Sequence, residues 1–535
     1  MTSRADLSTD VLVVGFGAAG ACAALEARAA GAEVLAVDRF NGGGATALSG
    51  GIIYAGGGTS VQRRAGVDDS TGGMLAYLRQ EVGDSVRPET LQRFVADSAA
   101  MIDWLAGHGV PFDTSTCPYK TSYPSNRYYL YYSGSECSGE FRAVTPPVQR
   151  GHRVKGRGAS GKKLYEPLAA SAQRAGVRLQ PHTRVTRLLM EGGRVTGAEA
   201  VTMADAPERI RRRFGQLAAV AAKPGIYVPA LRSVLERRLQ RLEEEFGRRI
   251  RIEARRGVIV CAGGYIANRA MIATHAPQYR GGLALGTSGD DGSGIGMLVE
   301  AGGVADRLDN VSVWRFITPP AAFLGSIVVD RRGNRFIDES RYGAALGRAM
   351  VNEHGGHAWI LADAALMRDA YRQLPRQSLW FHVMISLALF TTRGTRGKTL
   401  ADVARRAGLD PDGLAATVAA HNAAIDGGLA DDMGKSDDFR RRIGDGPYTL
   451  LDISARNSLT YPCPMMTLGG VKVDEDSGAV IDAGGTPIPG LYAAGRTAIG
   501  ICTNSYVSGL SISDCVFSGR RAGACAAARM PVTQS

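Results

Sequence analysis

The first forty residues switch between two hydrophobic patterns. DVLVVG (10–15) is a short run of β-branched apolar residues, which is typical of a buried strand. ACAALEARAAG (21–31) follows with small and apolar residues, as in a closely packed helix, and EVLAVD (33–38) is a second strand-like run. Strand, helix and strand in this order predict an α/β unit with parallel strands.

A glycine-rich turn joins the first strand to the helix and reads Gly15-Phe16-Gly17-Ala18-Ala19-Gly20. Gly15 permits the tight turn, Gly17 lets a pyrophosphate approach the backbone, and Gly20 lets the helix pack closely on the strand. The helix N-terminus would face the phosphates, and Asp38 would accept hydrogen bonds from ribose hydroxyls. This arrangement predicts a dinucleotide site, and both FAD and NAD fit it.

Helical periodicity returns at 203–250, where Leu231, Leu235, Leu239 and Phe246 recur among Arg and Glu residues. We interpret this segment as a helical insertion. It either packs on the body of the protein as a surface helix or docks on anionic lipid as a basic amphipathic element.

Two later segments are also rich in apolar residues. TLADVARRAG and LDPDGLAATVAAHNAAI (399–425) predict two helices joined by a turn. Because the second has no basic outer face, we expect the pair to pack on its domain rather than to bind DNA. SLWFHVMISLALF (378–390) is shorter than the roughly 18 apolar residues of a membrane span. It predicts either buried core or an apolar wall for a hydrophobic substrate.

Composition and charge narrow the range of partners. The chain has 535 residues, enough for two domains sharing one core, and a formal net charge of +12. The Arg-rich patches at 209–213 and 248–256 lack the interleaved aromatic residues of single-strand binders, so we expect no nucleic-acid partner. The eight cysteines lack metal-ligand spacing and predict buried free thiols, with no metal. Because no signal-peptide pattern is present, we expect a cytoplasmic protein, either free in the cytoplasm or peripheral to the inner face of the membrane.

Four further glycine-rich segments distinguish FAD from NAD. They are GGGATALSGGIIYAGGG (42–58), RGVIVCAGG (256–264), GTSGDDGSGIGM (286–297) and PGLYAAGR (489–496). Their order and spacing resemble those of a flavoprotein superfamily that contains fumarate reductases, succinate dehydrogenase flavoproteins and 3-ketosteroid dehydrogenases. The resemblance implies an α/β fold with a Rossmann-type FAD-binding domain at 1–270 and 448–535, split by an inserted α+β capping domain at 271–447.

FAD is the cofactor that this resemblance implies. In relatives with covalent FAD a histidine in the loop matching 44–46 carries the bond, and because Gly44, Ala45 and Thr46 stand here, we expect FAD to be held non-covalently. A last helix begins near Gly509, and its N-terminal dipole would stabilise a reduced, anionic flavin. The residues expected to contact FAD are Gly15, Gly17, Ala18, Ala19, Gly20, Asp38, Arg39, Thr46, Ser49, Gly50, Gly51, Val185, Ala262, Gly263, Asp291, Gly495, Arg496, Gly509, Leu510, Ser511 and Ile512.

The segments that bind substrate in fumarate reductases have a different character here. Their HHTMGG stretch corresponds to 465–470, where Met465 and Met466 replace two imidazoles, and their substrate-clamping arginine corresponds to Tyr506. A site lined in this way lacks the charge-assisted hydrogen bonds that hold two carboxylates. It suits a bulky apolar molecule with one or two oxygens, and the pattern is similar to that of 3-ketosteroid dehydrogenases.

Within that group, Tyr506-Val507-Ser508-Gly509 lacks the Tyr-Pro-Gly of the Δ1-forming enzymes and resembles the Tyr-x-Ser-Gly of the Δ4-(5α)-dehydrogenases, as does the tyrosine-rich stretch 128–134. A second catalytic tyrosine of the family follows an RFxxE motif, which matches Tyr342 after 335–339. We therefore expect Tyr506, Ser508 and Tyr342 to be catalytic. The alternatives are a wall of the flavin pocket for Tyr506, an N-cap for Ser508 and packing for Tyr342.

The expected reaction introduces the C4–C5 double bond into a 5α-3-ketosteroid, as in steroid degradation. A hydrogen bond to the 3-keto oxygen favours the enolate, a base takes a proton from C4, and hydride leaves C5 for flavin N5. Since an unperturbed Tyr has a pKa of about 10, a tyrosine base needs a neighbouring cation or a relay. The alternatives are a Δ1-dehydrogenase and a fumarate-reductase-like reductase of another unsaturated substrate. We also expect a separate electron acceptor, because the sequence carries no haem or iron–sulfur motif.

Overall fold

The computed structural model describes residues 5–458 and 460–528. Its largest element is an eight-stranded sheet in which six strands follow the order β19-β20-β9-β1-β2-β6, and the β7–β8 hairpin pairs with β9 through β8. The central strands β20, β9, β1, β2 and β6 are parallel, as the α/β prediction requires. The strands are β1 (Leu7–Val14), β2 (Val34–Val37), β6 (Arg178–Gln180), β7 (Thr183–Glu191), β8 (Arg194–Thr202), β9 (Arg248–Val260), β19 (Ala479–Ile481) and β20 (Pro487–Ala493).

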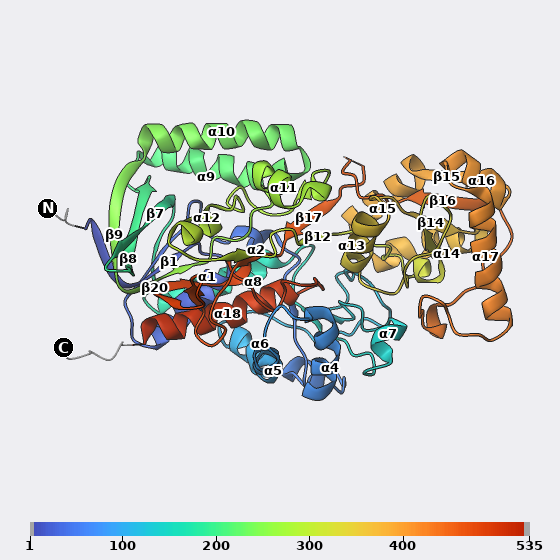
Figure 1. Cartoon of the computed structure of the whole chain (residues 1–535), viewed down its shortest axis with the longest axis horizontal. Helices are drawn as coiled ribbons and strands as arrows, with labels where there is room; N and C mark the ends of the chain where they lie inside the picture. The colour runs from blue at the N-terminus through green and yellow to red at the C-terminus, as the bar shows by residue number, and fades with distance from the viewer. Residues whose placement is uncertain (1–4, 459, 529–535) are drawn as a thin grey trace.

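Buried side chains of β1 alternate between the two faces of this sheet. Val11 and Val13 face the layer of α1 (Ala18–Ala29), α8 (Gly161–Arg174) and α18 (Leu510–Ala527). Leu12 and Val14 face the side that carries α12 (Ser293–Glu300). Helices α1 and α18 lie against each other (Figure 1), and the contact is so close that a Cβ on Gly523 would meet the carbonyl oxygen of Ala23. The small residues of segment 21–31 therefore serve a helix–helix contact.

A second sheet lies at the right of Figure 1 and has four antiparallel strands in the order β13-β14-β16-β15. The last strand of this sheet in sequence, β16, begins at Tyr448, one residue beyond the predicted end of the capping domain at 447. The bounds of this domain therefore stay a prediction, and we propose that residues 327–452 form its core. The helix pair predicted at 399–425 packs on this sheet through Val403 and Leu414, which confirms the packing interpretation. The elements are α13 (Gly343–Glu353), α14 (Ala364–Gln377), α15 (Trp380–Thr392), α16 (Leu400–Ala407), α17 (Pro411–Asp426), β13 (Ile327–Val329), β14 (Trp359–Ala362), β15 (Gly394–Gly397) and β16 (Tyr448–Asp452).

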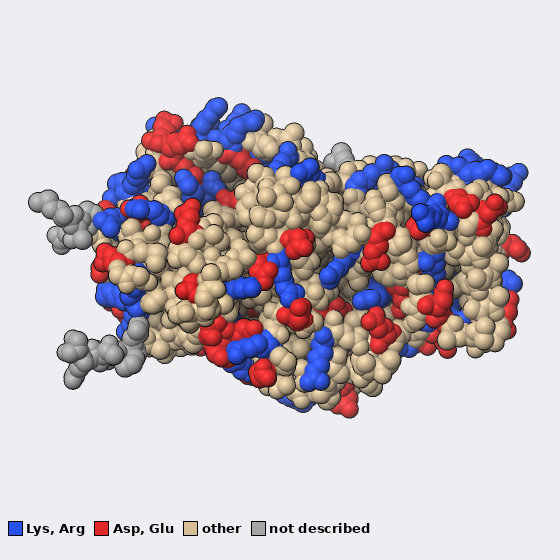
Figure 2. Space-filling model, viewed as in Figure 1, with Lys and Arg blue, Asp and Glu red and all other residues tan. Residues whose placement is uncertain are grey.

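The predicted insertion is a helical hairpin of α9 (Glu208–Ala222) and α10 (Pro229–Phe246), joined through the 3-10 turn η1 (Gly225–Tyr227). Phe214, Leu235 and Leu239 are buried between the two helices and pack against Phe40 of the main body. Acidic side chains stand among the basic ones over this hairpin (Figure 2), and some form i,i+4 pairs, as Arg232 does with Glu236 at 2.9 Å. The hairpin thus packs on the body of the protein.

A third sheet, β3-β5-β4, has three strands, and its strand β3 packs against α18. Helices α4, α5 and α6 lie below α18 in Figure 1. No helix in the described part of the chain combines the length and the hydropathy needed to cross a bilayer. All eight cysteines are free thiols and six are buried, as predicted. The remaining elements are α2 (Gly44–Leu48), β3 (Ile52–Tyr54), α3 (Ser60–Arg64), α4 (Thr71–Val82), α5 (Pro88–Ala96), α6 (Ser98–Gly107), β4 (Leu130–Tyr131), α7 (Gly139–Arg142), β5 (Gly151–Arg153), α11 (Arg269–His275), β10 (Leu283–Ala284), β11 (Ala305–Asp306), β12 (Val311–Val313), β17 (Pro464–Thr467) and β18 (Gly470–Val471).

Candidate active site

A long cavity of about 290 Å³ runs past the carboxyl ends of β1 and β2. Two helices begin at it, because Ala18 and Ala19 of α1 and Ser511 and Ile512 of α18 line its wall. Neither helix has a side-chain cap at its N-cap residue, which is a glycine in both cases. The cavity therefore receives the positive ends of two helix dipoles, an arrangement that favours anionic groups.

The glycine turn before α1 has the backbone that its sequence predicts. Gly15 has a φ of +91°, and a Cβ there would lie 2.5 Å from the carbonyl oxygen of Cys261 on β9's extension. A Cβ on Gly20 would collide with the carbonyl oxygen of Gly15. Both positions therefore require glycine, the first for conformation and close approach and the second for close packing of α1 on the turn.

Asp38 lies in the cavity wall, but its carboxylate also holds the backbone around it. One oxygen accepts a hydrogen bond from Phe16 N at 2.9 Å and the other from Phe40 N at 2.8 Å. Each carboxylate oxygen keeps a further lone pair that a ribose hydroxyl could use. The next residue, Arg39, pairs with the buried Glu243 of α10 at 2.8 Å, so the helical hairpin helps to build this end of the cavity.

Most of the residues expected to contact FAD are brought together in this cavity. Gly51 and Gly509 instead line the adjoining cavity described below, while Gly20 and Leu510 are buried in packing. Gly286, Thr287, Gly289 and Asp290 of the predicted cofactor segment 286–297 also line the cavity, although only Asp291 was predicted individually, and Asp290 forms a close ion pair with Arg496. The predicted residues that line the cavity are Gly15, Gly17, Ala18, Ala19, Asp38, Arg39, Thr46, Ser49, Gly50, Val185, Ala262, Gly263, Asp291, Gly495, Arg496, Ser511 and Ile512.

The donors in this cavity fit FAD. Thr46 Oγ1 accepts a hydrogen bond from Ala18 N at 3.0 Å and so positions the loop of α2 at the start of α1. Arg496 Nη1 is a buried nitrogen without a hydrogen-bond partner among the described residues. Amides of α1 suit a pyrophosphate, and the N-terminus of α18 suits a ring system that becomes electron-rich on reduction. No histidine lines the cavity within the described residues.

A second cavity, of about 300 Å³, adjoins the first and reaches toward the capping sheet. The two share wall residues, among them Gly50, Trp314 and Tyr506. Its far side is formed by α15, which contributes Phe381, Ile385, Leu389 and Phe390, so the apolar run at 378–390 serves as a wall. Apolar surface dominates this cavity, as expected for a bulky apolar ligand.

The three predicted catalytic residues all line this second cavity. The ring of Tyr506 stacks on Trp314 with centroids 5.2 Å apart and lies 6.1 Å from the ring of Tyr342. Ser508 is buried and accepts a hydrogen bond from the hydroxyl of Tyr131 at 3.3 Å. The N-cap alternative for Ser508 is wrong, because the N-cap residue of α18 is Gly509 and no side chain caps this helix.

All three phenols at this site are kept neutral. Burial raises the pKa of Tyr506 above its usual value, although hydrogen bonding by the Gly509 amide acts in the opposite direction. Burial also raises the pKa of Tyr342 and of Tyr131 well above the usual value, although the Ser508 hydroxyl lowers both somewhat. These tyrosines are therefore hydrogen-bond donors at neutral pH and not ionised bases.

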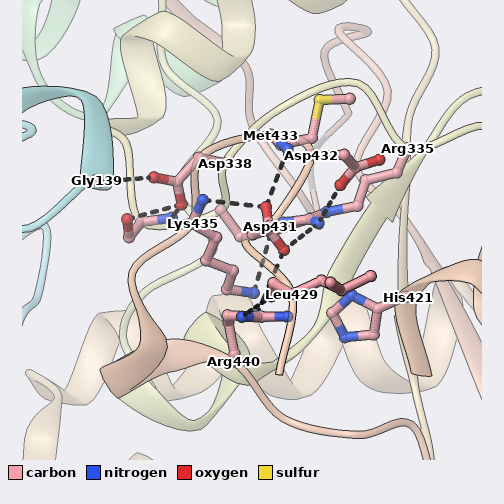
Figure 3. A network of polar contacts seen from close by, with 12 residues as sticks. Gly139, Arg335, Asp338, His421, Leu429, Asp431, Asp432, Met433, Lys435 and Arg440 are labelled. Carbon is pink, nitrogen blue, oxygen red and sulfur yellow. Dashed lines mark hydrogen bonds and ion pairs between the residues drawn. The ribbon is translucent and has the colours of Figure 1, made fainter. Parts of the chain in front are cut away.

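The loop that carries Tyr342 is anchored by a buried ionic network (Figure 3). Arg335 pairs with Asp431 at 2.7 Å, as Figure 3 shows. Glu339 pairs with Arg335 at 2.8 Å and with Lys435 at 3.0 Å. Breaking such a buried network by removing one partner typically costs about 3–5 kcal/mol. The RFxxE motif therefore supplies an anchor, and that anchor fixes the position of the tyrosine that follows it.

Sequence reasoning missed several residues of the site. Tyr131 had a signal, since it lies in the tyrosine-rich stretch 128–134, but its contact with Ser508 spans 377 residues of sequence. Trp314 and Tyr227 had none, although Tyr227 of the hairpin turn lines both cavities. Both methionines replace imidazoles that bind substrate in fumarate reductases. Met466 lines the first cavity, as this replacement leads one to expect, whereas Met465 is buried in the core.

Comparisons with known proteins agree with this geometry. The family described as "FAD binding domain" matches residues 10–509. The 3-oxo-5-alpha-steroid 4-dehydrogenase of Comamonas testosteroni is 39% identical over 91% of this chain and 92% of its own length. The 3-oxosteroid 1-dehydrogenase of Mycobacterium tuberculosis is 26% identical over 93% of this chain and 94% of its own length. Among solved structures, the 3-ketosteroid-delta4-(5alpha)-dehydrogenase of Rhodococcus jostii RHA1, in complex with 4-androstene-3,17-dione, superposes with a TM-score of 0.82 at 29% identity and covers 99% of both chains.

Proposed function

This chain belongs to the FAD binding domain family and, within it, to the family of the Comamonas 3-oxo-5-alpha-steroid 4-dehydrogenase, and from this premise we propose that it is an FAD-dependent 3-ketosteroid dehydrogenase that forms the C4–C5 double bond of a 5α-3-ketosteroid. One observation carries the proposal. Tyr506, Ser508 and Tyr342 line a single apolar cavity that shares its wall with the FAD cavity. The chemistry is oxidation of a CH–CH group.

The hydroxyl of Tyr506 and the amide of Gly509 are the donors for the 3-keto oxygen. They lie near each other, because the backbone at Gly509 acts on the Tyr506 phenol and lowers its pKa, against the larger effect of burial, which raises it. Two donors aimed at one oxygen stabilise the negative charge that develops on it as the neighbouring C4 loses a proton. The neutral state of Tyr506 suits this role, because an ionised phenol could donate nothing.

Proton removal at C4 falls to the hydroxyl cluster of Ser508, Tyr131 and Tyr342. Ser508 lies closest in the chain to the donor pair, and Tyr131 hydrogen-bonds it from behind at 3.3 Å. FAD, bound non-covalently in the first cavity, supplies the acceptor for the hydride from C5. The absence of histidine from residues 44–46, where covalent relatives carry their bond, supports the non-covalent state.

A reductase of dicarboxylates is disfavoured by the hydrogen bonds of Arg315, the one arginine among the described residues that line the substrate cavity. Arg315 donates hydrogen bonds to the carbonyl oxygens of Pro462 at 2.7 Å and of Ser454 and Arg456 at 2.9 Å. Its guanidinium is therefore engaged with backbone and is not presented to a carboxylate. Dehydrogenation at C1–C2 is the second candidate, and the presence of a 3-oxosteroid 1-dehydrogenase among the relatives at 26% identity keeps it in the test.

The test is anaerobic mixing of the yellow holoprotein with 5α-androstane-3,17-dione. Bleaching of the flavin with formation of the 4-ene product supports the proposal. A 1-ene product would assign the protein to the second candidate. If no 3-ketosteroid bleaches the flavin, the steroid proposal fails.

We also propose that electrons leave to a separate acceptor.

We further propose that the α9–α10 hairpin contacts the cytoplasmic face of a membrane. Five apolar residues of the hairpin are 38–44% exposed, and one of them, Tyr227, also lines both cavities. Flotation with anionic vesicles tests the contact. Leu231→Asp should reduce the bound fraction several-fold, whereas Val144→Asp, at an exposed site on another element, should leave it unchanged. Equal flotation of both variants would reject it. The five residues are Val220, Tyr227, Val228, Leu231 and Val234.

A further inference from the structure

The helix α15, which forms the far side of the substrate cavity, turns its polar side chains toward the ligand. Between residues 380 and 390 the polar residues are His382 and Ser386, one helical turn apart, and both line the cavity. Trp380 and Met384 lie on the outer side of the same helix and are 78% and 60% exposed. A surface helix ordinarily has the opposite arrangement, with its polar side chains in water and its apolar ones inside.

Neither inward polar side chain is hydrogen-bonded within the described part of the chain. The Nδ1 atom of His382 is buried without a partner, and the Ser386 hydroxyl has no partner either. Two hydroxyls at the end of the same helix bond its backbone instead, Thr391 to Leu387 O at 2.8 Å and Thr392 to Ala388 O at 2.7 Å. Since polar groups inside proteins almost always find a partner, His382 and Ser386 indicate a polar atom on the ligand.

The histidine of this pair is neutral at physiological pH. Burial lowers the pKa of His382 to about 4, and the nearby Arg153 acts in the same direction. The Arg153 guanidinium lies 4.8 Å from the ring centre of Tyr123, the tyrosine that His382 packs against. A neutral imidazole has one N–H donor and one acceptor nitrogen, and a serine hydroxyl both donates and accepts. The pair therefore suits an uncharged ketone or alcohol and offers no positive charge to a carboxylate.

This pair is separated from the proposed donors to the 3-keto oxygen by other residues of the cavity wall. A Cβ on Gly509 would lie 2.8 Å from Ile52 Cγ2, so Ile52 stands beside the donor end. A Cβ on Gly50 would lie 2.9 Å from Ile52 Cδ1 and 2.6 Å from Tyr123 Cε2, so Tyr123 comes next. The ring of His382 follows, with its centroid 5.8 Å from that of Tyr123. Ile52 and Tyr123 both line the cavity and thus lie between its two polar ends.

A steroid has polar groups at two ends in the same way. Its four fused rings are rigid and apolar, the 3-keto oxygen is on the first ring, and the C17 substituent is on the last. If the 3-keto oxygen is held by Tyr506 and Gly509, the last ring points toward α15. The apolar side chains of Phe381 and Ile385 then cover the ring system, and His382 and Ser386 are left for the substituent at C17.

We propose that His382 and Ser386 form a second polar subsite, which binds an oxygen at C17 and selects 17-keto and 17-hydroxy steroids over steroids with a hydrocarbon at this position. The imidazole or the hydroxyl donates to a 17-ketone, and either accepts from a 17-hydroxyl. A substrate without this oxygen leaves both side chains without a partner, which is how a polar site rejects an analogue that lacks the matching group. This inference rests on the proposed steroid dehydrogenation.

The test compares two substrates on the holoprotein and on three variants. 5α-Androstane-3,17-dione carries the C17 oxygen, and 5α-androstan-3-one lacks it but keeps the reacting carbons. His382→Phe keeps an aromatic ring against Tyr123 and removes the ring nitrogens, and Ser386→Ala removes one hydroxyl. Thr391→Ala is the matched control, because Thr391 is on the same helix but is exposed and bonds the helix backbone. Anaerobic stopped-flow reduction of the flavin gives the dissociation constant of each steroid.

The wild type should bind the dione about tenfold more tightly than the mono-ketone, the preference expected from the hydrogen bonds that only the dione can make. His382→Phe should raise the dissociation constant of the dione about tenfold and abolish the preference, and Ser386→Ala should reduce the preference about threefold. Thr391→Ala should keep it.

Equal dissociation constants of the two steroids in the wild type would overturn the inference. A preference that survives in both His382→Phe and Ser386→Ala would overturn it as well, because another group would then bind the C17 oxygen. In both cases the flavin is still reduced, so the proposed function stands. A wild type that no 3-ketosteroid reduces would instead overturn the proposed function.

Discussion

Replacing Tyr506 by Phe removes one oxygen from the substrate cavity and little else. The Tyr506 ring stacks on Trp314 at 5.2 Å and lies 6.1 Å from the ring of Tyr342, and a phenylalanine ring can keep both contacts. The hydroxyl forms no hydrogen bond to another side chain among the described residues, so its loss leaves no buried side chain without a partner. The variant should therefore fold and bind FAD like the wild type, and its defect should be confined to the chemical step.

The magnitude follows from the number of donors at the 3-keto oxygen. Removal of one donor from an oxyanion site costs about 2.7–4 kcal/mol in the transition state. Because the Gly509 amide remains as a second donor, we take about 3 kcal/mol, which is a fall of about 10²-fold in the rate of flavin reduction. The ground-state ketone loses only an ordinary hydrogen bond of about 0.5–1.5 kcal/mol, so the dissociation constant of the steroid should rise less than about tenfold.

Stopped-flow reduction of the flavin at several steroid concentrations separates the two effects. Tyr461→Phe is the control, because Tyr461 is another tyrosine in the same cavity wall, with its ring against Arg315. A rate constant that falls less than tenfold in Tyr506→Phe would refute the assignment of this hydroxyl to the keto oxygen. The same would follow from an effect confined to the dissociation constant.

Three further predictions concern the frame around the site. Gly509→Ala should abolish FAD loading, because φ is +96° and a Cβ would lie 2.6 Å from Tyr54 N; full flavin content by absorbance would contradict this. Glu243→Gln should weaken FAD binding about tenfold by releasing Arg39, and an unchanged dissociation constant by flavin fluorescence would argue against it. Burial lowers the pKa of His152 to about 4 in the folded protein, whereas a histidine in the unfolded chain has a pKa of about 6.5. Between these two pH values the unfolded chain binds more protons than the folded one. The free energy of unfolding should therefore fall by about 3 kcal/mol as the pH drops through this window. His152→Gln should reduce that slope in urea titrations, and an unaltered slope would exclude His152 as its source.

The cofactor side of the molecule could be predicted because its signals are local. Gly15 and Gly20 act within a single strand–turn–helix unit, and their roles follow from backbone geometry that a short sequence window contains. Asp38 was predicted from the same window, yet its hydrogen bonds to Phe16 N and Phe40 N were not, because the pattern identifies the residue and not its partners. The helices of the insertion were predictable from periodicity, whereas the pair between Glu243 and Arg39 was not, because it joins residues 204 positions apart.

The substrate side was predictable only through resemblance. Tyr506, Ser508 and Tyr342 were identified by their place in family motifs, and hydrophobic periodicity alone would not have distinguished them from packing residues. The apolar run of α15 was ambiguous for the same reason: a wall of a cavity and a core helix have equal need of apolar side chains. Only the spatial meeting of the capping sheet and α18 decides which role the run serves.

The electrostatics of the site explain why hydroxyl groups suit this cavity better than carboxylates. An apolar, water-poor cavity strengthens the hydrogen bonds of Tyr506 and Gly509 to a developing oxyanion. The same surroundings would raise the pKa of a carboxylate in the cavity and place a charge against an apolar substrate. Neutral hydroxyls at Ser508, Tyr131 and Tyr342 avoid this conflict, because they can exchange a proton while the cavity itself stays uncharged. The raised pKa values of Tyr131 and Tyr342 are then no obstacle to proton transfer, since neither residue has to exist as a phenolate.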